Sequence, residues 1–399
     1  MHNFLAYFPA PSSQKKCYFY KNLVPFGVFM RLMNGCLKHI ISVFLLILPV
    51  CAFSQKTLEP ALQVLVFAPD ARSAAMGDAG IATSADVNSQ HWNVAKYVFA
   101  ANEGGVGLSY TPWLRDATSD IDITYLSGFY RFAGNQSLSA SLRFFSLGNV
   151  DLYTKDAQYL QSIKPNEFAI DIAYSRRLGR YFSGGITFRY INSSKVVVEN
   201  FSNVISKASN IATDVAFYYQ KPVNIFGIDD SEIAFGATVS NLGTKLKLSD
   251  SSSYFLPARL GLGLRATCNI DSENAVSAVI ELKKSLVPTD YAYRDSDVLS
   301  AAGKGIFSDF SQMIYIVGAE YSYKNTLMFR AGYHRESKLS ADNSYITFGV
   351  GVTYENLHFD ASYLFVTSNE KTAMNNTYRI SLAWTFGNKN RNYQAYDLQ

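Results

Sequence analysis

The sequence predicts an all-β protein, a 14-stranded antiparallel transmembrane β-barrel with an N-terminal plug. Three observations lead to this fold class. Segments of about ten residues that alternate apolar with small or polar side chains recur from Gly104 onward. The connections between them are alternately short and long, and a secretion-type leader precedes them. The composition agrees, because charged residues reach only 17%, below the roughly 25% usual in soluble domains.

A leader opens the chain and ends at Ser54. Its apolar run, residues 40–53, is too short for a spanning helix, which needs about 20 residues. The run ends in "CAFSQ", where Ala52 and Ser54 stand at the small-residue positions of a signal peptidase site, so we expect cleavage after Ser54. The alternative is a lipoprotein acylated at Cys51, although the small residue usual before such a cysteine is missing. Because the stretch ahead of the run is long, we expect the true start at Met30 or Met33.

The net charge of +4 comes from this leader. Five of the 36 Lys and Arg residues lie in residues 1–54, which contain no Asp or Glu, so the rest carries 31 basic and 32 acidic residues. No basic stripe remains, which argues against a nucleic acid partner. Beyond the leader only Cys268 remains, which excludes an intramolecular disulfide and a thiolate metal cluster.

The strands are predicted from alternation. In "TYRISLAWTF", residues 377–386, one face is Tyr, Ile, Leu, Trp and Phe and the other is Arg, Ser, Ala and Thr. The apolar face is expected to contact outer-membrane lipid, and the other to line the interior. Fourteen segments follow this pattern: 104–114, 122–132, 137–147, 167–178, 181–193, 210–220, 232–241, 256–268, 274–284, 313–323, 326–335, 344–354, 356–366 and 376–386.

The connections alternate in length. The even-numbered ones, such as "AGNQ" and "KN", are tight turns, with the longer "KPVNIFGIDDS" as an exception. The odd-numbered ones include 148–166, 194–209, 242–255 and 285–312, which are long and polar. Transmembrane barrels have this pattern, with their long loops outside the cell. A soluble protein of two packed sheets is the alternative, but it does not explain the leader or long loops at one end.

Inward-facing charges are few. Asp171, Arg330 and Asp360 fall on the predicted inner face. They would form either a charged ring in a pore or interior ion pairs in a closed barrel, and we favour ion pairs.

The segment 55–103 lacks strand alternation. Its "APDARSAAMGDAG" matches no phosphate-binding glycine motif, and it predicts a helical turn followed by glycine-permitted bends. A barrel of this size has a lumen too wide for its own side chains to fill. We therefore expect 55–103 to fold inward as a plug, with 104–386 forming the barrel and 387–399 a tail.

The same segment carries a family resemblance. "APDARSAAMGDAGIATSADVNSQHWNVAKY" resembles the signature of the PorV family, outer-membrane barrels of the type IX secretion system in Bacteroidota that are related to the FadL fatty acid transporters. Val94 departs from the signature, since the family has proline there. The plug positions that we single out on this basis are Asp70, Arg72, Met76, Gly77, Asp78, Gly80, Asp86, His91, Trp92 and Asn93.

The resemblance implies a function in protein secretion. A PorV relative would bind the C-terminal signal domain of cargo proteins at the translocon (SprA, also called Sov) and shuttle them to the attachment complex with its sortase PorU. It would be no enzyme and need no cofactor. The alternatives are a FadL-like transporter of hydrophobic small molecules, with an apolar lumenal pocket, and an enzyme acting on lipopolysaccharide.

Hydrolysis and cargo binding would each use a different set of side chains. For hydrolysis the conceivable pair is His334 with Ser344, and no H-E-x-x-H or G-x-S-x-G motif is present. For cargo binding, exposed aromatic residues in long loops are typical of protein-binding surfaces. The candidates are Tyr153, Tyr159, Phe201, Tyr254, Phe255, Tyr291 and Tyr293.

Overall fold

The computed structural model describes most of the chain beyond the leader. The predicted leader and the tail 388–399 lie outside the described residues, which belong to the unit Val50–Gln399. The described ranges are 61–113, 115, 120–153, 158–199, 202–225, 227–249, 252–287, 296–307, 313–336, 344–367 and 377–387.

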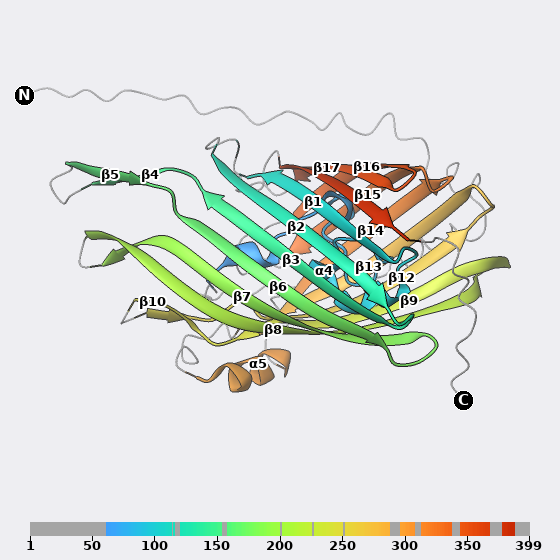
Figure 1. Ribbon diagram of the computed structural model, residues 1–399, viewed down its shortest axis with the longest axis horizontal. Coiled ribbons are helices and arrows are strands. Elements are labelled where there is room, and N and C mark those ends of the chain that lie inside the picture. Colours follow the sequence, from blue (N-terminus) through green and yellow to red (C-terminus); the bar gives the residue numbers. More distant parts are fainter. Residues whose placement is uncertain are drawn as a thin grey trace, which may run out of the picture. The chain divides into compact units, whose positions relative to one another are not determined.

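Within these ranges, fourteen antiparallel strands form a closed barrel, in which the first strand pairs with the last (Figure 1). The predicted 14-stranded antiparallel barrel is confirmed, and each predicted segment overlaps one barrel strand. The strands are β1 (Gly104–Pro112), β2 (Ile121–Phe132), β3 (Gln136–Leu147), β6 (Asn166–Arg177), β7 (Phe182–Glu199), β8 (Ser202–Ile225), β9 (Ile228–Gly243), β12 (Arg259–Asn269), β13 (Asn274–Ser285), β14 (Met313–Tyr323), β15 (Leu327–Glu336), β16 (Ser344–Tyr354), β17 (Leu357–Val366) and β18 (Tyr378–Phe386).

The two faces of the wall differ as the alternation predicts. On β18, Ile380 and Leu382 are exposed on the outer face, whereas Arg379 and Ser381 are buried on the inner face. Successive strands repeat this pattern, so the outside of the barrel is a band of exposed Leu, Ile, Val, Phe and Tyr. An apolar outer wall is what contact with lipid requires.

Short turns gather at one end of the barrel, on the right in Figure 1. Lys324 and Asn325, between β14 and β15, both have positive φ, as a tight hairpin turn requires. The turn with "KPVNIFGIDDS" is shorter than the sequence suggested. Strands β8 and β9 continue into it and pair at Ile225 and Ile228, so that only residues 226–227 connect them.

The opposite end carries the long connections, and here the structure adds elements that alternation did not predict (Figure 1). The predicted loop 194–209 is wrong, because β7 and β8 pair from Ser194 with Lys207 to Glu199 with Ser202. The other long connections contain β4 (Val150–Tyr153), β5 (Tyr159–Ile163), β10 (Leu246–Ser249), β11 (Ser252–Tyr254) and the helix α5 (Val298–Phe307).

Residues 61–100, which we call the inner segment, lie inside the ring of strands (Figure 1). Nearly all of them are buried, and they hydrogen-bond to inward-facing side chains of strands from β2 to β18. The segment contains four short helical pieces, none long or apolar enough to span a membrane, and the same holds for α5. The four pieces are η1 (Gln63–Val66), α3 (Ala71–Ala75), α4 (Ser89–Trp92) and η2 (Val94–Phe99).

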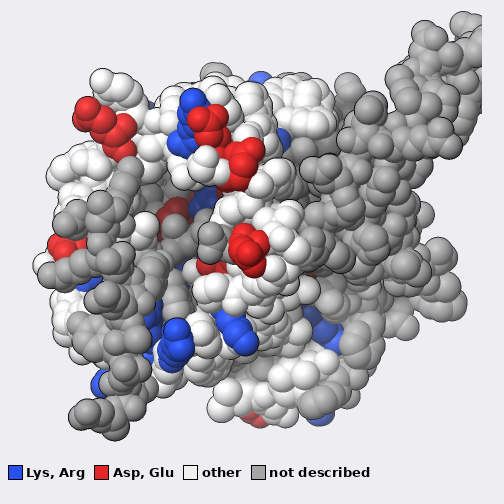
Figure 2. Space-filling model, turned by 90° about the vertical axis from the view of Figure 1, so that its right-hand side faces the viewer, with Lys and Arg blue, Asp and Glu red and all other residues white. Residues whose placement is uncertain are grey.

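The short-turn end faces the viewer in Figure 2. Acidic and basic side chains both occur on this end, and neither sign covers it. The described part of this end is therefore mixed in charge.

Candidate functional site

Asp70 is the N-cap residue of α3 in the inner segment. The Asp70 carboxylate accepts hydrogen bonds from the Ser73 N–H at 2.9 Å and from Trp92 Nε1 at 2.6 Å. Burial, together with the nearby charge of Asp86, raises the pKa of Asp70 to about 6. One side chain thus joins two helical pieces that lie far apart in the sequence.

Arg72 starts a chain of alternating charges that crosses to the barrel wall. It pairs with Asp86 at 2.9 Å and with Glu320 on β14 at 3.2 Å. Glu320 also accepts from Arg330 on β15 at 2.6 Å, and Arg330 pairs with Asp360 on β17 at 2.6 Å. The interior ion pairs predicted for Arg330 and Asp360 are confirmed, and the two residues pair with each other. This chain anchors the inner segment to three strands, because each charge has an opposite neighbour.

Gly77 and Asp78 bring the backbone against β15 and β16. A Cβ on Gly77, whose φ is +73°, would lie 2.9 Å from the carbonyl oxygen of Tyr333. The Gly77 N–H donates to Thr347 Oγ1 at 2.9 Å, and Asp78 accepts from the Tyr345 hydroxyl at 2.6 Å. Glycine is required here for both the left-handed backbone and the close approach.

Met76 fills the space beside this contact. It is buried with Val279, Ile314 and Ile316 of the wall, and a Cβ on Gly318 would lie 2.7 Å from the Met76 Cβ. A flexible thioether side chain suits such an irregular gap.

Gly80 lies directly against Trp92, and a Cβ on Gly80 would overlap the indole ring. The ring also lies 4.5 Å from Lys283 Nζ of β13, within cation–π range. Lys96 Nζ donates to the Gly80 carbonyl at 2.7 Å and to Thr83 Oγ1 at 3.0 Å. Burial lowers the pKa of Lys96 to about 8.

Asn93 and His91 complete the contacts. Asn93 Nδ2 donates at 3.0 Å to the carbonyl of Ile81 and at 3.0 Å to that of Phe217 on β8. His91 Nδ1 pairs with the Arg143 guanidinium of β3. Burial, reinforced by the Arg143 charge, holds the pKa of His91 well below its usual range, so this imidazole is neutral.

Val94 occupies the proline position of the family signature. It is the first residue of η2, and Asn93 caps that turn by accepting from the Ala95 N–H at 3.1 Å. Proline suits a first helical position because the N–H there needs no helical partner. The Asn93 cap keeps the turn in place without proline.

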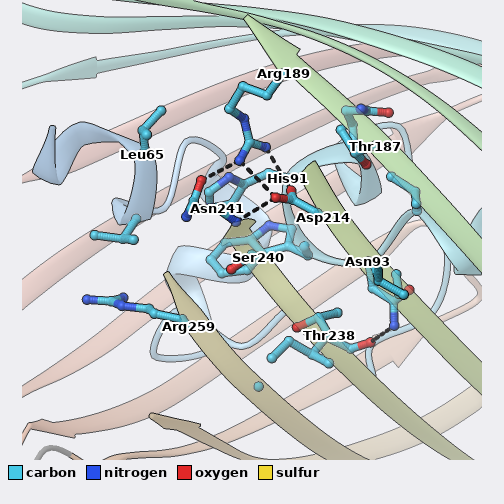
Figure 3. Close-up of a pocket in the computed structure, with 18 of the residues that line it drawn as sticks. Leu65, His91, Asn93, Thr187, Arg189, Asp214, Thr238, Ser240, Asn241 and Arg259 are labelled. Atoms are coloured by element: carbon cyan, nitrogen blue, oxygen red, sulfur yellow. Dashed lines mark hydrogen bonds and ion pairs between the residues drawn. The ribbon is translucent and has the colours of Figure 1, made fainter. Parts of the chain in front are cut away.

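A small cavity lies between the inner segment and the wall of β7, β8, β9, β12 and β13 (Figure 3). Its volume is about 60 Å³. Arg189 pairs there with Asp171 at 2.7 Å and with Asp214 at 3.0 Å, and Asp214 also accepts from the Asn241 N–H at 2.6 Å. The predicted interior ion pairing of Asp171 is therefore confirmed.

Two predicted loop aromatics form an exposed pair at the long-loop end. Tyr153 on β4 and Tyr159 on β5 meet edge to face, with ring centroids 6.0 Å apart. They are 48% and 59% exposed, and Leu160 beside them is 56% exposed. Phe201, Tyr291 and Tyr293 lie outside the residues whose side chains are described.

The adjacent candidates Tyr254 and Phe255 differ in exposure. Tyr254, at the end of β11, is exposed. Phe255 is buried with Val287 and with Ala301 of α5, while Lys245 Nζ lies 4.5 Å from its ring centroid. The expectation that Phe255 offers an exposed contact is wrong, since α5 was not predicted in the connection that covers it.

The described residues hold no catalytic or metal constellation that we can identify. His334 stacks on Tyr345 at 4.3 Å between centroids, and its Nδ1 lies 3.1 Å from the Gly77 carbonyl oxygen. Ser344 lies opposite Arg335 instead, so His334 and Ser344 are not cross-strand partners. Among the described residues, no group of three His, Cys, Asp or Glu side chains could hold a metal ion.

The sequence analysis did not identify the strand residues that hydrogen-bond to the inner segment. Glu281 Oε1 accepts from the backbone N–H groups of Ile81 and Ala82, and the Arg379 guanidinium donates to the Ala68 carbonyl at 3.1 Å. Such residues look like ordinary inward-facing positions of a strand. The only local signal is a charge on the inner face of the alternation.

A closed antiparallel barrel with an apolar outer wall and a packed interior defines an outer-membrane β-barrel protein. Within that class, the family model described as "Type IX secretion system protein PorV" matches residues 51–292, which is more than half of the chain. The chain belongs to the PorV family and is an outer-membrane component of the type IX secretion system.

Several solved barrels have a similar chain path. The toluene transporter TbuX of Ralstonia pickettii is 12% identical, with 80% of this chain and 98% of that one covered and a TM-score of 0.46. The toluene transporter TodX of Pseudomonas putida is 12% identical (83% and 98% covered, TM-score 0.47). A FadL homologue of Pseudomonas aeruginosa is 9% identical (83% and 100% covered, TM-score 0.44). No curated protein sequence matches the chain.

Proposed function

We propose that this protein is a non-enzymatic carrier in type IX secretion. It binds the C-terminal signal domain of a secreted protein as the cargo leaves the translocon (SprA, also called Sov), and it passes the cargo to the sortase PorU of the attachment complex. Family membership supports the setting. The observation that carries the proposal is the packed interior, which leaves the outer surface as the place where cargo is bound.

The interior gives cargo no room. The inner segment contacts strands around the ring, and the cavity beside it has only about 60 Å³, enough for a few water-sized groups. A folded domain or an extended peptide needs far more space. We infer that the inner segment keeps the barrel closed in the manner of a plug.

The long-loop end is our candidate for the cargo surface, and we place it outside the cell. Tyr153 and Tyr159 form an exposed aromatic pair on a hairpin that stands apart from the barrel sheet. Aromatic side chains of this kind dominate the energy of many protein interfaces. Tyr254 lies on a second such hairpin at the same end.

The transporter alternative requires an apolar pocket in the lumen. The cavity between the inner segment and the wall has about 60 Å³, which is too small for a fatty acid, and its lining includes the charged side chains Arg189, Asp214 and Lys283. This observation favours the carrier over the transporter.

Binding to an isolated cargo C-terminal domain tests the proposal. The purified barrel in detergent should retain this domain on a sensor surface. The double variant Tyr153→Ser/Tyr159→Ser should weaken binding by roughly tenfold or more, the usual effect of removing central aromatic contacts.

The matched control is Tyr354→Ser. Tyr354 is 71% exposed but lies on β16 beside a short turn, at the other end of the barrel. It should bind cargo like the parent protein. Absence of any binding by the parent, with normal secretion in cells that lack the protein, would overturn the proposal.

A further inference from the structure

Two cations lie beside one aromatic ring at the short-turn end of the barrel. Tyr181 ends the turn between β6 and β7, and its ring meets that of Tyr219 on β8, with centroids 6.2 Å apart. The guanidinium carbon of Arg180 lies 5.2 Å from the Tyr181 ring centroid, and Lys221 Nζ lies 5.9 Å from it. Both distances are within cation–π range, so two positive charges gather around one ring. Both cations are exposed, whereas the two tyrosines are half-buried.

These two charges have no carboxylate partner among the described residues, where neither Arg180 nor Lys221 forms an ion pair. Lys324, on another short turn, shows the balanced arrangement. Its Nζ lies 5.3 Å from the ring centroid of Tyr323 and also pairs with Glu273 at 3.1 Å. Like charges close together repel each other, so the two neighbouring cations favour an anion that comes from outside the described chain.

The outer face of β8 places these charges at the edge of the lipid-facing wall. Phe217, Tyr219 and Lys221 are two residues apart and therefore share this face. Tyr218 between them is buried on the inner face. Phe217 stacks on Phe182 of β7 at 5.8 Å with an interplanar angle of 8°, and both phenyl rings are exposed. Along the strand the side chains thus change from apolar through tyrosine to cationic, as they do where hydrocarbon meets headgroups.

We propose that this rim binds the phosphate group of an anionic phospholipid in the periplasmic leaflet. The short turns of outer-membrane barrels face the periplasm, which brings Arg180 and Lys221 to the level of the headgroups. Arginine and lysine side chains form charge-assisted hydrogen bonds with phosphate oxygens. The exposed rings of Phe182 and Phe217, next to them on the wall, contact the acyl chains.

The apolar pair favours a lipid over an acidic segment of a periplasmic protein. Both ligands would supply negative charge to Arg180 and Lys221. Only a lipid also uses the stacked rings of Phe182 and Phe217, which belong to the outer wall that faces the hydrocarbon. The site does not depend on the carrier function, because it lies at the end of the barrel opposite the proposed cargo surface.

Native mass spectrometry of the full-length protein in detergent tests the site. The parent should retain phosphatidylglycerol in preference to zwitterionic phosphatidylcholine. Arg180→Gln/Lys221→Gln should weaken phosphatidylglycerol binding by roughly tenfold, because each basic side chain near a membrane surface adds to the attraction. Lys324→Gln is the matched control, since this cation also lies over a tyrosine ring but has Glu273 as its partner, and it should bind like the parent. Equal retention by the parent and the double variant would overturn the proposal.

Inorganic phosphate and a poly-glutamate peptide separate the other sources of negative charge. Excess inorganic phosphate should leave phosphatidylglycerol bound, because it offers no acyl chain to the wall. Phe182→Ala should reduce lipid retention several-fold and keep the preference for the anionic lipid. Displacement of the lipid by phosphate, with no effect of Phe182→Ala, would show a simple anion site instead. Binding of poly-glutamate that depends on Arg180 and Lys221, without any such dependence for the lipid, would show a protein-binding rim and contradict the proposal.

Discussion

Several side chains of the inner segment each make hydrogen bonds to two different parts of the chain, so few other residue types would fit at these positions. Asp70 caps a helix and holds an indole, Asn93 caps another turn and reaches the wall, and Gly77 and Gly80 permit contacts that a Cβ would block. The sequence predicted the local backbone of this segment, a helical turn followed by bends at the glycines. The partners, such as Thr347, lie hundreds of residues away, and no local pattern marks them.

Asp70 predicts a pH dependence. Because its pKa is about 6 in the packed state and 3.8 in an unfolded chain, the packed state binds more protons between these values. Stability relative to Asp70→Asn should therefore fall as pH rises from 4 to 6, by an amount on the order of a few kcal/mol. Denaturant unfolding of both proteins in detergent at several pH values measures this difference. A difference that stays constant across the window would contradict the assignment.

Gly80 predicts a steric effect. Gly80→Ala puts a methyl group into the space of the Trp92 ring and should destabilise the packed inner segment by about 1–3 kcal/mol. Hydrogen exchange of residues 70–100 should accelerate accordingly. Gly303→Ala in α5 is the control, since a Cβ there meets no atom within 4 Å, and it should leave this exchange unchanged. Equal protection in both variants would be inconsistent with the Gly80 contact.

At the scale of elements, the period of two predicted every barrel strand because each strand separates an apolar outside from a small or polar inside. The same rule did not predict β4, β5, β10 or β11, which form two separate two-stranded sheets outside the barrel sheet. It also missed α5, whose sequence "VLSAAGKGIF" lies within a long polar connection. Strands β7 and β8 were predicted too short, because residues 194–209 were assigned to a loop, whereas the two strands pair through most of that range.

The ion pairs by which Arg72 joins the inner segment to the barrel wall can be tested. Arg72→Met leaves the buried Glu320 and Asp86 without one partner, and breaking a buried pair in this way usually costs about 3–5 kcal/mol. The inner segment should then become accessible to protease in intact, detergent-solubilised barrels. Lys324→Met removes an exposed ion pair with Glu273 and should have almost no effect. Protease resistance in the Arg72 variant would show that the charge chain does not anchor the segment.

At the scale of the whole molecule, the interior is a packed core and the exterior is a lipid-facing wall. This reverses the arrangement of a porin, in which the interior is a water channel. The leader and the order of partners in secretion cannot be derived from the barrel fold, because a period of two describes only the strands of the wall.

Because the interior is packed, we expect that the protein does not conduct ions across a membrane. Reconstituted in a planar bilayer, the parent protein should give no conductance steps, since about 60 Å³ of cavity does not form a continuous path. A variant lacking residues 61–100 is the informative partner if it still forms a barrel, and it should conduct. Regular channel openings by the parent protein would show that the inner segment does not close the lumen.

The order in which the chain is synthesised sets a limit on how this interior forms. The Ala71 N–H donates to Ser381, and Arg379 of the final strand donates to Ala68, so residues made early depend on residues made last. The ring itself closes only when β18 meets β1. These contacts of the amino-terminal portion can therefore form only after the last strand has been synthesised. Until then, the machinery that inserts the barrel must hold this portion in an incompletely folded state.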